Sequence, residues 1–571
     1  MSDTTASTTA NKEAPPWAAG TENRDHELNP ELSEAEIDVV RGYGEEKSFD
    51  DGAILWSVGQ RDACYYLVLE GELEIVRQDA LGEEVIVTHG RGHYGGEIVT
   101  MSGRGALVAG RAKGALRAIV VKPGQVRDLL ALEAELGEKI LLSFILRRMR
   151  MITQHFGDVY LVGSANEPKT AKLREFLSRN GVPHDVIDPH SEDHRSAREK
   201  LEIDGATLPL VICGPQRLQA PTTKEVADCL GMSAELEDGA EFELAVVGAG
   251  PAGLAAAVYA ASEGLSVVAL EKCAVGGQAG SSSRIENYLG FPTGISGQAL
   301  TGRGFLQAQK FGAEVAIARE AASFECGDAW HTIGLENGQR IRARAVVIAT
   351  GAIYRQPNME GLDRFEGSNV HYGASHIQAM LCRNKDVAII GGGNSAGQAA
   401  IYLANRAKRV SILIRGESLA HSMSDYLIRR IDRTQNIDVL NHTEARSLHG
   451  GDCGMEHISI WNNQTDKTRN LDAEHLFIFI GARPASDFLS SQIALDEKGF
   501  IKTGADLCEN TLAKFDWPLD RKPYLGETSC PRVFAVGDIR SGSVKRVASA
   551  VGEGSVCVQL VHKTLEEIDA L

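Results

Sequence analysis

The sequence predicts a multidomain protein: an N-terminal β-roll, a small α/β domain, and an α/β region with two Rossmann-type dinucleotide-binding units. Three observations support this prediction. The chain has 571 residues, which is too long for a single hydrophobic core. Its first part reads as short strands broken by glycines, and later segments alternate strands with helices. Two glycine-rich turns lie beyond residue 240.

The two glycine-rich turns have the strand–turn–helix context of dinucleotide-binding folds. GAGPAG at 248–253 follows the apolar strand 242–247, and GGGNSA at 391–396 follows the strand 387–390. Glycine lets the backbone approach a pyrophosphate, and the helix N-terminus offers free N–H groups. The candidate phosphate-binding residues are Gly248, Gly250, Gly253, Gly391, Gly393 and Ala396.

The second strand of each unit ends in a residue of different charge. About 20 residues after the glycine turn, this position contacts the adenosine ribose. Glu271 can accept a hydrogen bond from a free 2′-hydroxyl, whereas Arg415 suits a 2′-phosphate. We therefore expect one dinucleotide without that phosphate and one with it. FAD beside NADPH is the simplest pair.

Composition excludes several classes of protein. The net charge of −18 argues against nucleic acid as a partner, and no segment is apolar for long enough to span a membrane. The ten cysteines are spread singly, with no CxxC. This usage is typical of a reducing compartment, so we expect a cytoplasmic protein. We assign no metal site.

The region before the glycine-rich turns divides into three segments. Residues 1–30 are rich in Ser, Thr, Ala and Glu, so we expect a disordered tail. The β-roll is expected over 31–153 and the small α/β domain over 156–232. An acidic linker at 235–243 leads into the C-terminal region.

The C-terminal motifs resemble those of the low-molecular-weight thioredoxin reductases in their order. GAGPAG, Glu271, GGQ at 276–278, ATG at 349–351, GGGNSA and VFAVGD at 533–538 carry this resemblance. It implies an FAD domain in two pieces, 240–360 and 480–571, with an NADPH domain inserted at 361–479. It also implies a homodimer.

The resemblance also implies roles for individual residues. Gly277 and Gln278 would lie along FAD, Asn287 would face the isoalloxazine region, and Asp538 would contact the ribityl or phosphate side. The implied FAD-binding residues are Gly248, Gly250, Gly253, Glu271, Gly277, Gln278, Asn287, Gly351, Gly537 and Asp538.

The segment in which this family carries its redox-active CxxC has no cysteine pair. Residues 372–384 read YGASHIQAMLCRN. One thiol cannot form the intramolecular disulfide that passes two electrons to a substrate. The candidate catalytic residues are His376, which would protonate a reduced acceptor, and Cys382, the single thiol. The alternative for His376 is a histidine satisfied in a domain interface.

The β-roll resembles a cyclic-nucleotide-binding domain. YYLVLEGELEIV at 65–76 and GGEI at 95–98 carry the resemblance. It implies a phosphate cassette that begins at Gly96 and Glu97, with Glu97 on the ribose hydroxyl. The Arg for the cyclic phosphate is absent at its usual distance, because Arg104 comes early and Arg111 late. Such a cassette either binds another anion or serves only for packing, and we expect weak cyclic-nucleotide binding.

The small α/β domain resembles a thioredoxin or glutaredoxin fold. The strand 159–162, the loop 164–169 and the Thr207-Leu-Pro209 segment carry the resemblance, and Pro209 matches the cis-proline of that family. The loop that would hold redox cysteines reads SANEPK. We therefore expect no thiol exchange by this domain.

Two functions remain open at this point. The intact nucleotide units favour an FAD-dependent NADPH oxidoreductase that resembles thioredoxin-disulfide reductase. Its acceptor is a small molecule or a small redox protein, and a disulfide, a quinone, ferredoxin and oxygen all qualify. The missing CxxC motivates the alternative, a regulatory flavoprotein that senses nucleotides and redox state with little turnover.

Overall fold

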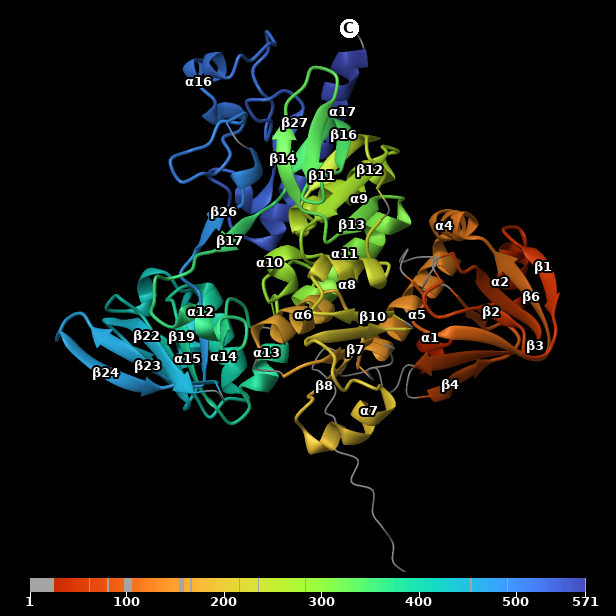
Figure 1. Cartoon of the computed structure of the whole chain (residues 1–571). Coiled ribbons are helices and arrows are strands. Elements are labelled where there is room, and N and C mark those ends of the chain that lie inside the picture. The colour runs from red at the N-terminus through yellow and green to blue at the C-terminus, as the bar shows by residue number, and fades with distance from the viewer. Residues whose placement is uncertain are drawn as a thin grey trace, which may run out of the picture.

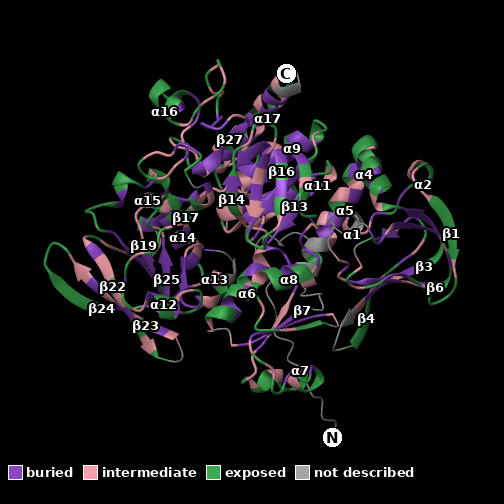
Figure 2. Ribbon diagram, turned by 45° about the horizontal axis from the view of Figure 1, so that its top comes forward, coloured by how far each residue is buried: buried purple, intermediate pink, exposed green. Residues whose placement is uncertain are grey.

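The computed structural model describes most of the chain beyond residue 24. The described ranges are 25–60, 62–79, 82–96, 105–153, 159–164, 167–214, 216–234, 236–282, 284–374, 376–451, 454–489 and 491–569. A central sheet domain lies among three others (Figure 1). Buried residues concentrate in this central sheet (Figure 2). None of the helices in the described ranges is both long and apolar enough to cross a bilayer.

The N-terminal domain is an antiparallel β-roll flanked by helices. Its sheet follows the path β1-β6-β3-β4, with β2 on β6 and β5 on β3. Its elements are α1 (Asp25–Leu28), α2 (Glu34–Arg41), β1 (Glu45–Phe49), β2 (Ile54–Trp56), β3 (Tyr65–Asp79), β4 (Gly82–His89), β5 (Tyr94–Gly95), β6 (Ala109–Val121), α4 (Pro123–Leu132) and α5 (Ala134–Thr153).

The strands of the β-roll are longer than the sequence predicted. Gly71 was expected to break a strand, but it lies inside β3 at a φ of +82°. A Cβ there would lie 2.2 Å from the carbonyl oxygen of Ala115 in the paired strand. Glycine thus lets β3 bend without ending, and the pairing with β6 shifts register at this point.

The middle domain is a four-stranded sheet in the order β10-β9-β7-β8. β8 is parallel to β7, and the other neighbours are antiparallel. The Leu208–Pro209 peptide before β9 is cis. Its elements are β7 (Val159–Val162), α6 (Pro168–Arg179), β8 (Asp185–Ile187), α7 (Arg195–Lys200), β9 (Leu210–Cys213), β10 (Gln216–Gln219) and α8 (Thr223–Cys229).

The central domain, here called the first nucleotide domain, contains a sheet in the order β13-β12-β11-β16-β15-β14, with β27 beside β16. β11, β12, β13, β16 and β27 are parallel. Helices cover this part, which explains its nearly continuous apolar strands. Its elements are β11 (Ala240–Val247), α9 (Pro251–Ser262), β12 (Val267–Glu271), α10 (Gly277–Gly280), α11 (Gly297–Lys310), β13 (Glu314–Ile317), β14 (Ala321–Glu325), β15 (His331–Leu335), β16 (Arg340–Ile348), α16 (Glu509–Lys514), β27 (Val533–Ala535) and α17 (Val547–Asp569).

The inserted domain combines a parallel sheet, β18-β25-β19-β20-β21, with an antiparallel one, β22-β23-β24. The chain enters and leaves it through β17 (Ala352–Tyr354) and β26 (Ala482–Pro484), which pair with each other. Its elements are α12 (Leu362–Phe365), β18 (Val370–His371), α13 (His376–Leu381), β19 (Asp386–Ile390), α14 (Asn394–Ala404), β20 (Arg409–Leu413), α15 (Asp425–Asp432), β21 (Ile437–Leu440), β22 (Thr443–Gly451), β23 (Gly454–Asn462), β24 (Lys467–Asp472) and β25 (His475–Ile478).

Both N-terminal domains pack on the first nucleotide domain. Phe176 and Leu177 of α6 belong to one buried cluster with residues of α9 and α17. Arg319, next to β13, pairs with Asp228 of α8 at 2.8 Å. The β-roll contacts α11 through Leu306, which is buried with residues of α4 and α5. The middle domain therefore shares a hydrophobic core with the first nucleotide domain.

Candidate functional site

The first glycine turn joins β11 to α9 in the manner that a bound pyrophosphate requires. A Cβ on Gly253 would lie 1.8 Å from the carbonyl oxygen of Gly248, so helix and turn touch closely. Gly248 itself has a φ of +106°, and its Cβ would lie 2.5 Å from the carbonyl oxygen of Ala349. A Cβ on Gly250 would meet no atom within 4 Å. The two outer glycines permit packing, and the middle one faces open space, as phosphate binding needs.

Glu271 ends β12 beside this turn and is almost fully buried. Its carboxylate accepts hydrogen bonds from the backbone N–H groups of Ala249 (2.9 Å), Cys273 (2.9 Å) and Ala274 (3.2 Å). Burial raises the pKa of Glu271, and these backbone donors oppose that shift. The carboxylate is thus held beside the turn, where it would accept a hydrogen bond from a ribose hydroxyl.

The loop that begins α10 lies against the first glycine turn. A Cβ on Gly277 would be 3.2 Å from the Cα of Gly250. The amide of Gln278 donates a hydrogen bond to the carbonyl oxygen of Ala352, where the chain crosses to the inserted domain. Gly351 precedes that strand at a φ of +68°, with open space beside it. Gly250, Gly277, Gln278 and Gly351 therefore line one region.

The C-terminal piece of the chain adds Gly537 and Asp538 to this region. A Cβ on Gly537 would lie 3.0 Å from the side chain of Ala252, in the first turn of α9. The N–H of Gly537 donates to Glu553 of α17 at 2.7 Å. Burial raises the pKa of Asp538, and Lys545 lowers it. These contacts bring the turn of Gly537 and Asp538 to the start of α9.

Asn287 lies in the exposed loop between α10 and α11. The neighbouring Glu286 pairs with Arg430 of α15 at 3.2 Å. Arg284, Glu286, Tyr402 and Arg430 line a cavity between this loop and the inserted domain. The loop that carries Asn287 is therefore joined to the inserted domain.

The second glycine turn repeats the pattern of the first. A Cβ on Gly391 would lie 2.4 Å from the carbonyl oxygen of Phe479, whereas one on Gly393 would meet no atom within 4 Å. Ala396 replaces the third glycine and is fully buried. Arg415 is exposed beyond β20, and its carbonyl accepts a hydrogen bond from Asn463 at 3.0 Å. Within the described part of the chain, no ion pair involves the Arg415 guanidinium, which is exposed beside this turn.

The two expected catalytic residues lie at opposite ends of α13. His376 begins the helix, and its side chain lies outside the described part of the structure. Cys382 follows the helix and is fully buried in the core of the inserted domain. Burial raises the pKa of Cys382 to about 12. A nucleophilic thiol must ionise, so this geometry argues against the expected catalytic role of Cys382.

The expected nucleotide cassette of the β-roll is only partly within the described ranges. Glu97 and Arg104 lie outside them. Gly96 has a φ of +89° and packs over the carbonyl of Cys64. Arg111 pairs with Glu74 at 2.8 Å and Glu83 at 2.7 Å, so two carboxylates already neutralise its charge. This pairing argues against the expected role of Arg111 as the phosphate ligand.

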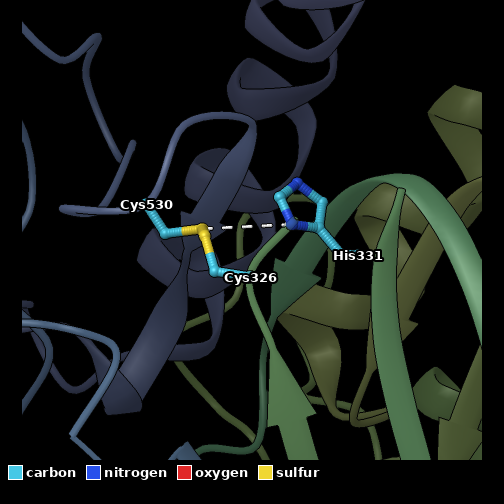
Figure 3. Close-up of side chains that lie close together, drawn as sticks. All are labelled: Cys326, His331 and Cys530. Carbon is cyan, nitrogen blue, oxygen red and sulfur yellow. Dashed lines mark hydrogen bonds between the residues drawn. A yellow bond between two sulfur atoms is a disulfide. The ribbon is translucent and has the colours of Figure 1, made fainter. Parts of the chain in front are cut away.

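Four of the nine cysteines in the described ranges are paired, which corrects the expectation that the cysteines stand singly and removes its support for a reducing compartment. Cys213 bonds to Cys229 within the middle domain, and Cys326 bonds to Cys530 across 204 residues of sequence. Nδ1 of His331 lies 3.9 Å from Sγ of Cys530 (Figure 3). These three side chains have metal-ligand atoms within 4.8 Å of one another. Because the sulfurs are bonded to each other, they offer no thiolate pair to a metal ion.

The Cys326–Cys530 pair is remote from the nucleotide site along the sheet. Cys326 follows β14, and Cys530 precedes β27, whereas the glycine turns and Gly537 follow the ends of their strands. β27 is parallel to β16. Since Val533 of β27 pairs with Val346 and Val247 pairs with Ile348, Cys530 lies further from the C-terminal ends of these parallel strands than the first glycine turn does.

Comparisons with known proteins agree with this geometry. Residues 242–554 match the family model described as pyridine nucleotide-disulphide oxidoreductase, and residues 46–133 match the cyclic nucleotide-binding domain. Thioredoxin reductase of Mycoplasmopsis pulmonis is 29% identical over 327 residues, which are 57% of this chain and 98% of that protein. The Schizosaccharomyces pombe thioredoxin reductase is 30% identical over 336 residues, with 57% and 98% covered.

Solved structures show the same relationship. The Lactococcus lactis thioredoxin reductase in its FR conformation matches with a TM-score of 0.51 and 26% identity, covering 57% of this chain and 99% of that one. The T. acidophilum thioredoxin reductase matches with a TM-score of 0.50 and 28% identity, with the same coverage.

Alanine at two positions of the first turn should separate folding from cofactor binding. Gly250→Ala should leave the melting temperature of the cofactor-free chain unchanged, because its Cβ meets nothing. It should still weaken FAD binding at least tenfold, since the methyl group enters the phosphate space. Gly253→Ala should lower stability itself through the clash with Gly248. Calorimetry and flavin fluorescence measure both effects, and full FAD affinity in Gly250→Ala would contradict the assignment.

Proposed function

The chain belongs to the pyridine nucleotide-disulphide oxidoreductase family, and we propose that it passes electrons from NADPH through FAD to an acceptor that meets the flavin directly. It is an NAD(P)H-dependent flavoprotein oxidoreductase related to the thioredoxin reductases. When bound, FAD supplies the hydride chemistry, and the protein supplies binding and orientation.

The residues proposed to hold FAD come from both pieces of the first nucleotide domain. The turn at Gly250 and the N-terminus of α9 would bind the pyrophosphate through backbone N–H groups. Glu271 would accept the ribose hydroxyl, and Asp538 would contact the middle of the cofactor. Gly277 and Gln278 would close the opposite side, because they lie against Gly250 and the crossing strand.

The residues proposed to hold NADPH come from the inserted domain. The turn from Gly391 to Gly393 would take its pyrophosphate, and Arg415 would pair with the 2′-phosphate. Arg429, another arginine of this domain, already pairs with Asp425 at 2.5 Å. Arg415 is therefore the residue on which the preference for NADPH depends.

The proposal that electrons leave directly from the flavin rests on one observation: the sequence has no cysteine pair around α13. In the sequence, Ala374 and Ile377 stand in the segment that resembles the family's CxxC region. The single thiol of that segment, Cys382, is buried, and burial raises its pKa to about 12. Electrons would then leave from the flavin itself, to a small molecule or a small redox protein. The acceptor classes that qualify are a disulfide, a quinone, ferredoxin and oxygen.

We propose that the middle domain is a thioredoxin-like module without redox cysteines. Its strand order β10-β9-β7-β8 supports this assignment. The proposed domain limits are those expected from the sequence, with the FAD domain divided by the inserted NADPH domain. A homodimer, which the resemblance to the thioredoxin reductases implies, completes the proposal.

Replacement of Arg415 should change the preference between the two nicotinamide cofactors. Arg415→Ala should raise the KM for NADPH about tenfold or more, because a charge-assisted phosphate contact contributes roughly 1.5–3 kcal/mol. The KM for NADH should change less than about twofold. Arg409→Ala, at the other end of β20, is the matched control. Equal losses for NADPH and NADH in Arg415→Ala would mean that Arg415 does not contact the phosphate.

Thioredoxin should be a poor substrate of this chain. Steady-state assays with NADPH should show reduction of a quinone or ferredoxin acceptor at a rate well above that of thioredoxin. Cys382→Ala should leave the rate with the better acceptor within about twofold, because a thiol with a pKa of about 12 is not ionised at neutral pH. Efficient thioredoxin reduction that disappears in Cys382→Ala would refute the proposed exit path.

Cyclic nucleotides should bind the β-roll weakly. A buried phosphate without a paired cation is costly, and Glu74 and Glu83 already neutralise Arg111. Calorimetric titration of the full chain with cyclic AMP should give a dissociation constant of about a millimolar or weaker. A micromolar constant that is lost in Arg111→Ala would show that the arginine exchanges its carboxylate partners for the phosphate.

A further inference from the structure

The middle domain reaches the proposed FAD site through the C-terminal end of α6. The guanidinium of Arg179 donates a hydrogen bond to the carbonyl oxygen of Gly277 at 3.0 Å. The side-chain amide of the next residue, Asn180, donates a hydrogen bond to the carbonyl oxygen of Cys273 at 3.1 Å. Gln298 of α11 donates in the opposite direction, to the carbonyl oxygen of Ser178 at 2.9 Å. Two of these contacts fasten the end of α6 to the loop 273–277, and the third joins it to α11.

The loop held by α6 is the one that lies against the phosphate turn. Gly277 approaches Gly250 so closely that a Cβ on Gly277 would be 3.2 Å from its Cα. Gly250 is the residue with open space beside it, where the pyrophosphate would bind. The hydrogen bond therefore brings the Arg179 guanidinium to Gly277, the residue that lies against Gly250.

Most of the hydrogen-bonding capacity of Arg179 remains available. A guanidinium has five N–H donors. Within the described ranges, the hydrogen bond of Arg179 to protein is the one to the carbonyl oxygen of Gly277, so its other N–H groups remain available to a ligand. Glu175, one turn earlier on α6, lies 3.9 Å away and is half exposed, so it screens the charge only loosely. The side chain of Arg179 is 26% exposed. A phosphate oxygen is the ligand that such a planar, partly desolvated cation prefers.

The charge of Arg179 acts on the residues around the proposed site. Burial raises the pKa of Glu271, and Arg179 acts in the opposite direction. The same holds for Tyr354, whose pKa burial raises and Arg179 lowers, while Asp538 acts on it with the opposite sign. The charge of one guanidinium from the middle domain thus acts both on Glu271, beside the first glycine turn, and on Tyr354 of the crossing strand β17.

We propose that Arg179 is a cofactor-binding residue which the middle domain contributes to the FAD site, where it pairs with the pyrophosphate. Glycine turns bind phosphate through neutral N–H groups, so a cation beside the turn adds charge that the turn lacks. This inference rests on the proposed function, because it requires that FAD occupies the first glycine turn. It gives a domain without redox cysteines a direct part in holding the cofactor.

The test compares FAD binding by the full chain with that of its Arg179→Gln and Arg179→Lys variants. Fluorescence of released flavin gives the dissociation constant. Arg179→Gln should weaken FAD binding about tenfold or more, and Arg179→Lys should retain most of the affinity because it keeps the charge. Arg195→Gln is the matched control, because Arg195 is a helical arginine of the same domain, paired with Glu199 at 3.2 Å and remote from the loop.

A second measurement separates phosphate binding from structural support. ADP and adenosine should each displace FAD from the chain, and only ADP carries the pyrophosphate. In Arg179→Gln the affinity for ADP should fall about tenfold, while that for adenosine stays within about twofold. Equal losses for both ligands would show that Arg179 only supports the loop, and unchanged ADP affinity would also overturn the inference. If Arg179→Gln does not fold, Arg179→Met takes its place, because it keeps an unbranched side chain without the charge, and the same outcomes for ADP and adenosine decide.

The two proposals fail in different ways in this experiment. A folded, unchanged chain that takes up no FAD would contradict the proposed function itself. A chain that binds FAD with the same affinity whether residue 179 is Arg or Gln would contradict only the role of Arg179.

Discussion

The close contact between Gly253 and the carbonyl of Gly248 is the constraint on which the rest of the first nucleotide domain depends. It lets α9 begin directly behind β11. A second close contact joins α17 to the start of α9, because a Cβ on Gly554 of α17 would lie 2.2 Å from the carbonyl oxygen of Ala252. α17 can therefore pack tightly on α9. This packing brings the C-terminal part of the first nucleotide domain next to the first glycine turn. Asp538 reaches the site by this route.

The middle domain is joined to this arrangement as a structural part. Phe176 and Leu177 are buried with residues of α9 and α17, so separating the domains would expose core surface to water. The other side of α6 faces the inserted domain. Burial lowers the pKa of His371 and of His475 there, and Arg174 of α6 lowers both further. One helix of the middle domain thus lies between the first nucleotide domain and the inserted domain (Figure 1).

Local spacing explains which parts of the site could be predicted from the sequence. The glycine turns, Glu271 and Arg415 follow from short-range patterns, because the strand–turn–helix unit sets their positions within about 20 residues. Asp538 required the resemblance to a family, since it returns from the far end of the chain. The burial of Cys382 depends on how α13 packs in the inserted domain, which a single cysteine in the sequence does not reveal.

Contacts between distant segments account for what the sequence could not predict. Cys326 and Cys530 are 204 residues apart, and nothing near either one indicates a partner. Arg111 has carboxylate partners on two other strands of the β-roll. Arg179 belongs to a domain for which the sequence predicted no chemistry, and only the docking of α6 brings it to Gly277. Each case depends on tertiary packing, which local patterns do not encode.

The central claim is that electrons leave the flavin without passing through a dithiol of this chain. Anaerobic titration of the FAD-loaded protein with NADPH, followed by flavin absorbance, counts the electron pairs that the chain takes up. The account predicts that one equivalent of NADPH per FAD bleaches the flavin completely. Bleaching that requires two equivalents, with the first consumed before the flavin is fully reduced, would reveal a disulfide in rapid exchange with FAD and contradict the account.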